Sequence, residues 1–206
     1  MRNWGALLLI LCISTVSCAS VEYGRIPLEG QWDYVVVQNT IPIESEGDVV
    51  LSSNDKKQLA MQLDRFPNAW KHIDKLVISD RLKPGILGLY KSNVIYVLHM
   101  DMDGMKQVLW HEVAHANSEN ITSEQLYEWC EVISDRLDEA GLEDVQHDKW
   151  DEKAHYEGFP SAYSTRNVWE FMAEHVMFHT INPERHKTLW PQEAALIEKH
   201  GLAPKY

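Results

Sequence analysis

One five-residue pattern constrains this chain more than any other feature: His-Glu-Val-Ala-His at residues 111–115. On an α-helix, side chains four positions apart lie on the same face, one turn above the other. His111 and His115 can therefore bind one Zn²⁺ through their imidazole nitrogens, and Glu112 can reach a water molecule on that metal. The pattern predicts a helix at this point and indicates a hydrolytic site.

The residues around the pattern favour a helix that is largely buried. Positions 108–110 and 113–114 are apolar, as expected where a metal site is enclosed. Asp101 and Asp103 lie just upstream, and either can cap the helix N-terminus. We expect the helix to run over about residues 103–118.

A catalytic zinc site needs a third protein ligand and one position left open for water. In one extended form of this motif, the third ligand is a histidine that would fall at position 121, with a glycine at position 118. This chain has Ser118 and Ile121 there, so that form is excluded. We therefore expect a carboxylate on a later helix. Nothing singles out a ligand among the glutamates of the next predicted helix, Glu124, Glu128 and Glu131. Glu170 and Glu174 are better placed, because they lie one turn apart on a helix rich in apolar residues.

Elsewhere the patterns predict strands first and helices afterwards. Short apolar runs predict strands at 34–37 and 76–78 and a hairpin formed by 85–90 and 94–99, while 49–51 is ambiguous. The first helix is expected to be capped by Ser53 or Asn54, and a capping-box pattern at 122–125 opens the third. Helical spacing predicts helices at residues 54–66, 103–118, 123–140, 167–180 and 191–200. This order predicts an α+β fold with the motif helix at the junction.

Composition narrows the class of partner. The 206 residues suit one compact domain. The formal charge of −12, with no basic stripe, argues against a nucleic-acid partner and against an anionic membrane surface. Cys130 is expected to be a buried apolar thiol without a disulfide partner in the mature chain.

The N-terminus is typical of an export signal rather than of the fold. A short basic start precedes an apolar run at residues 5–16 and a group of small residues. Cleavage can follow Ala19; alternatively, residues 15–18 resemble a bacterial lipoprotein box, with Thr15 where leucine is usual and Cys18 as the acylated residue. We expect a signal peptide at 1–18 and one domain at 19–206. The protein would then be secreted, periplasmic or lipid-anchored at the cell envelope, with membrane contact only through Cys18.

A longer pattern in the second half of the chain resembles a known family. Residues 161–174 read Ser-Ala-Tyr-Ser-Thr-Arg-Asn-Val-Trp-Glu-Phe-Met-Ala-Glu. Together with the first motif they resemble the catalytic domain of anthrax lethal factor and the secreted Pro-Pro endopeptidases, which are gluzincin-type zinc metallopeptidases. Those proteins carry H-E-x-x-H, then a tyrosine, and seven residues later a glutamate within an E-x-x-A-E run. Tyr163, Glu170 and Glu174 match these positions.

The resemblance implies a role for each matched residue. The ligands of a single Zn²⁺ would be His111, His115 and Glu170. Glu112 would be the general base and proton shuttle, and Tyr163 would donate a hydrogen bond to the oxyanion. Glu174 would support the site from behind, orienting a ligand histidine.

The same resemblance implies a zincin-like fold, with a small mixed β-sheet in the N-terminal half packed on a helical C-terminal half and the motif helix between them. It implies an exported, monomeric zinc endopeptidase that acts on a protein or peptide substrate. The matched residues do not extend to the substrate pockets, so a preference for proline is not implied.

Alternatives to this interpretation stay open from the sequence. A catalytically silent zincin-fold lipoprotein can act as a binding module, although such a protein has no need of Glu112. A zinc with a purely structural role would have four protein ligands. His175 and His179 form another pair four residues apart, and a second metal there is an open question.

Overall fold

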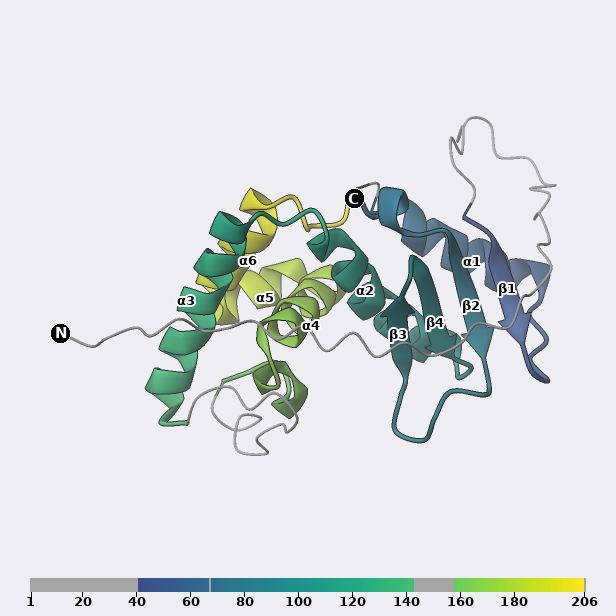
Figure 1. Ribbon diagram of the computed structural model, residues 1–206, viewed down its shortest axis with the longest axis horizontal. Coiled ribbons are helices and arrows are strands. Elements are labelled where there is room, and N and C mark those ends of the chain that lie inside the picture. The colour runs from purple at the N-terminus through teal and green to yellow at the C-terminus, as the bar shows by residue number, and fades with distance from the viewer. Residues whose placement is uncertain (1–40, 67, 143–157, 206) are drawn as a thin grey trace.

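The computed structural model describes residues 41–66, 68–142 and 158–205. These residues form a mixed α/β fold (Figure 1). The strands are β1 (Ile43–Glu46), β2 (Lys75–Ser79), β3 (Gly88–Lys91) and β4 (Val94–Leu98). The α-helices are α1 (Ser53–Asp64), α2 (Met102–Ser118), α3 (Ser123–Ala140), α4 (Val168–Ile181), α5 (Pro183–Leu189) and α6 (Pro191–Lys199). Two short 3₁₀ helices are η1 (Ala69–His72) and η3 (Ala162–Thr165).

The four strands make one mixed sheet in the order β1-β2-β4-β3. β2 pairs in parallel with both β1 and β4, and its apolar residues Leu76, Val77 and Ile78 are buried. β3 and β4 form an antiparallel hairpin. Ser92 and Asn93 make its turn in the left-handed conformation, with φ of 50° and 62°, as tight hairpin turns require. This topology places β3 at the edge of the sheet.

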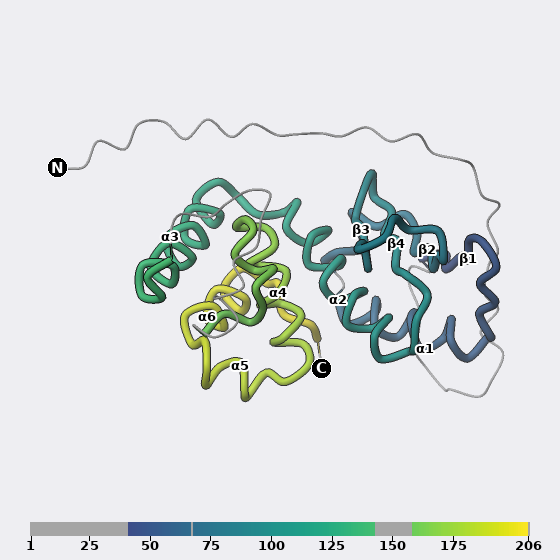
Figure 2. The backbone as a smooth tube through the Cα atoms, turned by 90° about the horizontal axis from the view of Figure 1, so that it is seen from below, coloured from purple at the N-terminus to yellow at the C-terminus, as the bar shows by residue number. Residues whose placement is uncertain are grey.

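The sheet half and the helical half lie side by side, and α2 lies between them (Figure 1). Seen from below, α1 and α2 lie on the same side of the sheet, while α3 to α6 form the other half (Figure 2). α2 contacts β3 and β4 on one side and α4 on the other. Each of the two helices buries an alanine, Ala114 in α2 and Ala173 in α4, and small side chains let helix axes approach closely. This contact joins the two halves of the molecule.

Most of the predicted elements are present. The strand at 76–78, the hairpin, and the helices at 54–66, 103–118, 123–140, 167–180 and 191–200 match the structure within a few residues. Asp101 caps α2 by accepting a hydrogen bond of 2.7 Å from the Gly104 amide. Thr122 and Gln125 form the predicted capping box of α3.

Other predictions were wrong or lie outside the described residues. α1 is capped by Ser52 rather than Ser53 or Asn54. Residues 49–51, ambiguous in the sequence, form no strand, and β1 lies just before them. Cys130 is exposed, because α3 turns Trp129, Ile133 and Leu137 inward and position 130 points away from that face. α5 and η3 were not predicted. The expected strand at 34–37 and the signal peptide at 1–18 lie outside the described part of the chain.

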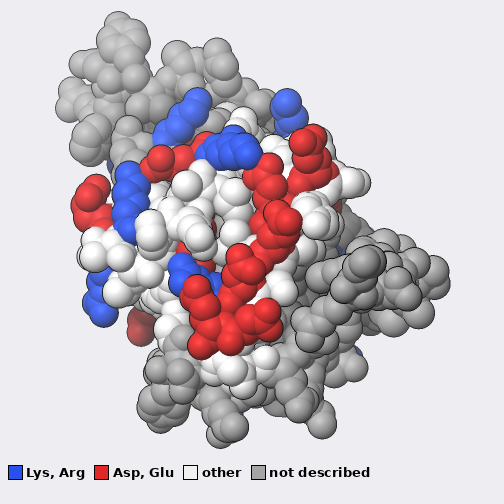
Figure 3. Space-filling model, turned by 90° about the vertical axis from the view of Figure 1, so that its left-hand side faces the viewer, with Lys and Arg blue, Asp and Glu red and all other residues white. Residues whose placement is uncertain are grey.

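The outer face of the helical half carries many acidic side chains (Figure 3). The exposed acids of α3 are Glu124, Glu131, Asp135, Asp138 and Glu139. This polar face is the solvated side of an amphipathic helix whose other side is buried. No helix in the described residues has the length and apolar character needed to cross a membrane.

Candidate metal centre

The motif helix α2 directs its two histidines toward α4 and Glu112 toward β3. His111 and Glu112 are 9% and 6% exposed. The imidazole rings of His111 and His115 lie one turn apart with their centroids separated by 4.9 Å. The i, i+4 spacing therefore places both rings on one face of α2, as the sequence predicts.

α4 brings a carboxylate to the same point. Its N-cap is Asn167, whose side-chain oxygen accepts hydrogen bonds of 3.0 Å from the amides of both Trp169 and Glu170. This cap fixes the first turn, and the Glu170 side chain leaves that turn toward α2. Glu170 Oε2 lies 3.0 Å from His111 Nε2 and 3.2 Å from His115 Nε2.

The three side chains form a group that can hold a metal ion. The two histidine Nε2 atoms are 3.1 Å apart, so two nitrogens and one carboxylate oxygen converge on a common point. Within the described residues no other group of three His, Cys, Asp or Glu side chains converges in this way. The structure therefore brings together the ligand set that the family resemblance implies, His111, His115 and Glu170.

The charges in this group favour a bound cation. Burial lowers the pKa of His111, but hydrogen bonds to Glu170 and Glu174 and the Glu112 charge outweigh burial and raise it to about 10. Burial acts to raise the pKa of Glu170, and the two histidines more than offset this and hold it well below its usual range. A metal ion would take the place of the proton that His111 shares with these carboxylates.

Glu174 lies behind the site. Its Oε1 atom is 3.0 Å from His111 Nδ1, on the opposite side of the ring from Glu170. This contact fixes the tautomer and the rotation of the ring, so that Nε2 faces the convergence point. The position matches the supporting role that the resemblance implies for Glu174.

Glu112 lies on α2, and its carboxylate faces the edge strand β3. The backbone amide of Tyr90 in β3 donates a hydrogen bond to its carboxylate. Burial raises the pKa of Glu112, while the charges of His115 and His111 oppose this. Gly88 makes the fit possible, since a Cβ atom there would lie 2.5 Å from Glu112 Oε1 and 2.5 Å from Val108 Cγ1. These contacts cannot be predicted from local sequence patterns, because they join residues of separate elements.

Tyr163 lies in η3 and contacts the metal-ligand group beside Glu170 and His111. Its hydroxyl donates a hydrogen bond of 3.0 Å to Glu170 Oε1, and its ring centroid is 6.0 Å from that of His111. Burial and the Glu170 charge raise the pKa of Tyr163 to about 12, so the phenol is protonated at neutral pH. Arg166 donates a hydrogen bond of 3.0 Å to the same hydroxyl, a contact that the motif does not predict.

The second histidine pair is part of a buried group of three, the histidine trio His175, His179 and His186. His186 lies on α5 and hydrogen-bonds to both others, over 3.0 Å to His175 Nδ1 and 3.3 Å to His179 Nδ1. Because it uses a different nitrogen toward each, the three do not converge on one point. Burial lowers the pKa of all three, to about 4 for His186. The trio is therefore neutral at pH 7 and packs α5 against α4.

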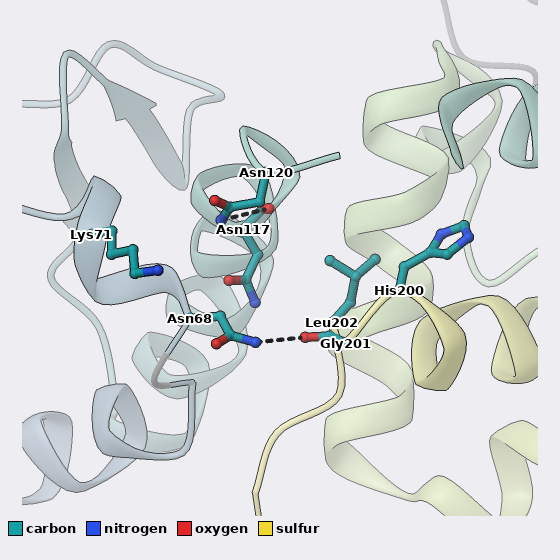
Figure 4. Close-up of a pocket in the computed structure, with 7 residues that line it drawn as sticks. All are labelled: Asn68, Lys71, Asn117, Asn120, His200, Gly201 and Leu202. Atoms are coloured by element: carbon teal, nitrogen blue, oxygen red, sulfur yellow. Dashed lines mark hydrogen bonds between the residues drawn. The ribbon is translucent and has the colours of Figure 1, made fainter. Parts of the chain in front are cut away.

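A small pocket lies on the seam between the two halves, near the C-terminal end of α2 (Figure 4). Across it Asn68 Nδ2 donates a hydrogen bond of 3.3 Å to the Gly201 carbonyl. Its lining residues are Asn68, Lys71, Asn117, Asn120, His200, Gly201 and Leu202. None of them belongs to the metal centre, so the pocket is distinct from the candidate site.

Comparisons of the chain with known proteins found no relative. No protein-family model, no curated protein and no solved structure matches the chain. The class of site is therefore argued from its own donor atoms and their surroundings.

Proposed function

We propose that the protein is an exported, zinc-dependent endopeptidase with a zincin-like fold, which hydrolyses peptide bonds in a protein or peptide substrate. One observation carries the proposal: the two Nε2 atoms and Glu170 Oε2 lie within 3.2 Å of one another, with Glu112 adjacent on the same helix. In this proposal each chain binds one zinc ion and acts as a monomer.

The donor atoms fit zinc. Two imidazole nitrogens and one carboxylate oxygen are a known ligand set of catalytic zinc, at metal–ligand distances of about 2.0–2.2 Å. The mutual separations of 3.0–3.2 Å are close to those of neighbouring ligands on a tetrahedral ion. The described residues add no fourth His, Cys, Asp or Glu to the group. This favours a catalytic site with an open position over a closed structural one.

The protein groups around the centre supply complementary chemistry. A zinc ion bound here would lower the pKa of a water molecule from about 15.7 to near 7 and polarise a peptide carbonyl. Glu112, whose pKa burial raises, is suited to accept the proton of the attacking water and to pass it to the leaving amine. Tyr163 can donate its hydroxyl proton to the carbonyl oxygen as negative charge grows there.

The edge strand suggests how a substrate lies. Among the described strands, β3 has a partner on one side only, and it runs beside α2. An extended peptide can pair with such an edge by main-chain hydrogen bonds, and this mode places a peptide bond next to the helix that carries Glu112. The mode favours a polypeptide substrate over a small molecule.

Metal removal tests the proposal. The mature protein, loaded with one equivalent of zinc, should cleave members of a degenerate peptide library. A chelator should abolish cleavage and added zinc should restore it, because the ion organises the water. Mass spectrometry of the library gives the products and the cleavage motif. Zinc-loaded protein that cleaves nothing, or cleavage that survives full metal removal, would contradict the proposal; the first result favours a binding module.

A further inference from the structure

Within the described residues, the Tyr163 hydroxyl contacts an acceptor, Glu170, and a donor, Arg166. Its hydroxyl donates to Glu170 Oε1 over 3.0 Å, and Arg166 Nη1 donates to the hydroxyl oxygen over 3.0 Å. A guanidinium has donors only and stays protonated in proteins. The phenol oxygen can therefore only accept from Arg166, and its own proton must point elsewhere.

We propose that Arg166 is a positioning residue that holds the Tyr163 oxygen in place and directs its O–H proton toward the metal centre, an inference that rests on the proposed peptidase function. In the structure this O–H donates to Glu170 Oε1, beside the Oε2 atom that faces the histidines. During hydrolysis it would turn to the substrate oxygen while Arg166 keeps the phenol oxygen fixed. The tyrosine is then set to donate before charge develops.

The local backbone holds the pair together. The Arg166 amide donates a hydrogen bond of 3.1 Å to the Tyr163 carbonyl, and its guanidinium carbon lies 5.6 Å from the centre of the tyrosine ring. Ser161 caps η3, since its side chain accepts a hydrogen bond of 3.3 Å from the Ser164 amide. One short turn therefore carries both the donor and the group that orients it.

The charge of Arg166 is directed at the same hydroxyl. Arg166 Nη1 lies 3.0 Å from the Tyr163 oxygen. No ion pair joins Arg166 to a carboxylate among residues 41–66, 68–142 and 158–205. Its polar contact with the tyrosine is thus not the by-product of a surface salt bridge.

A double-mutant cycle tests the role on zinc-loaded, full-length protein. R166M should lower kcat by about tenfold with KM changed less than twofold, because one oriented donor is loosened rather than removed. R166K should recover part of the loss. In a Y163F background, R166M should have no further effect. The zinc affinity of all variants should match that of the parent, and R185M, at an exposed arginine on α5, should leave kcat unchanged.

Additive effects of R166M and Y163F, or an unchanged kcat in R166M, would overturn the inference. A second measurement does not depend on activity. With ¹³Cζ-labelled tyrosine, the resonance that disappears in Y163F belongs to Tyr163; it should shift in R166M and stay in place in R185M. A resonance that stays in place in R166M overturns the orientation by Arg166. A shifted resonance in a protein without peptidase activity supports the orientation and overturns the proposed function instead.

Discussion

At the scale of single residues, the candidate site depends on contacts that hold each functional atom from two sides. His111 lies between Glu170 and Glu174, and the Tyr163 hydroxyl lies between Glu170 and Arg166. Such paired contacts fix the rings before a substrate arrives, which lowers the cost of organising the site during reaction. The site is therefore sensitive to changes in residues that touch neither metal nor substrate.

Gly88 provides a residue-scale prediction. In the G88A variant the added methyl group would meet Glu112 Oε1 and Val108 Cγ1, each 2.5 Å from the Cβ position, so the carboxylate must move. We expect kcat/KM to fall by about tenfold or more, because a displaced base transfers protons poorly. Zinc affinity should change little. Kinetics on a cleaved peptide and a zinc competition titration check this.

A matched control uses a glycine with open surroundings. Gly141 follows α3, and a Cβ atom there has no neighbour within 4 Å. Its φ of 65° makes G141A cost some stability but leaves Glu112 untouched. If G88A were as active as the parent, close approach of β3 would not position the base.

At the scale of elements, α4 has two functions. Its first turn supplies Glu170, and its later turns carry His175 and His179 against His186 of α5. Within the described part of the chain, the charged groups that act on the trio are Arg136 of α3, Glu184 and Lys187 of α5, and Glu198 of α6. Acidification therefore acts on the packing of α4, α5 and α6.

The sign of the pH effect follows from the depressed pKa values of the trio. Unfolded histidines take up protons near pH 6.5, whereas His186 folded does so only near pH 4 because it is buried and lies beside His179. The stabilising effect of the neutral trio is complete above pH 6.5 and is lost as the pH falls toward 4. We expect the shifted protonation of His186 alone to lower the free energy of unfolding by about 2 kcal/mol as the pH falls from 8 to 5.

Urea unfolding of the metal-free protein across this pH range measures the effect. H186Q should flatten the fall in unfolding free energy, whatever its own cost at pH 8. H99Q, at an exposed histidine, should keep the slope of the parent. An H186Q slope equal to that of the parent would show that the trio does not govern acid stability.

At the scale of the whole molecule, local patterns predicted much of the fold. The hairpin turn, the α3 capping box and the spacing of His111 and His115 all depend on residues close in sequence. Glu170 lies 59 positions from His111; helical spacing made Glu170 and Glu174 the favoured candidates, and the longer motif singled out Glu170. Residues such as Arg166 and Gly88 were missed, because their contacts are set by how η3, β3 and α2 pack in three dimensions.

Other errors have the same cause. α5 has only seven residues, too few for a clear helical period, and its Pro183 after the Asn182 cap was the one available sign. A small apolar thiol in a helical pattern predicts a buried Cys130, but the inward face of α3 is set by Trp129, which packs against Phe171. Tertiary packing therefore decides both what a short segment forms and which face a helix buries.

The central claim is that α2 and α4 together form a hydrolytic zinc centre in which Glu112 is the base. The most direct test compares the parent protein with E112Q, both shown to bind one zinc per chain, on the same peptide library. We predict that E112Q keeps the metal and loses at least about a hundredfold in kcat/KM, because the amide cannot accept the proton of the water. A zinc-loaded E112Q variant as active as the parent would contradict the claim.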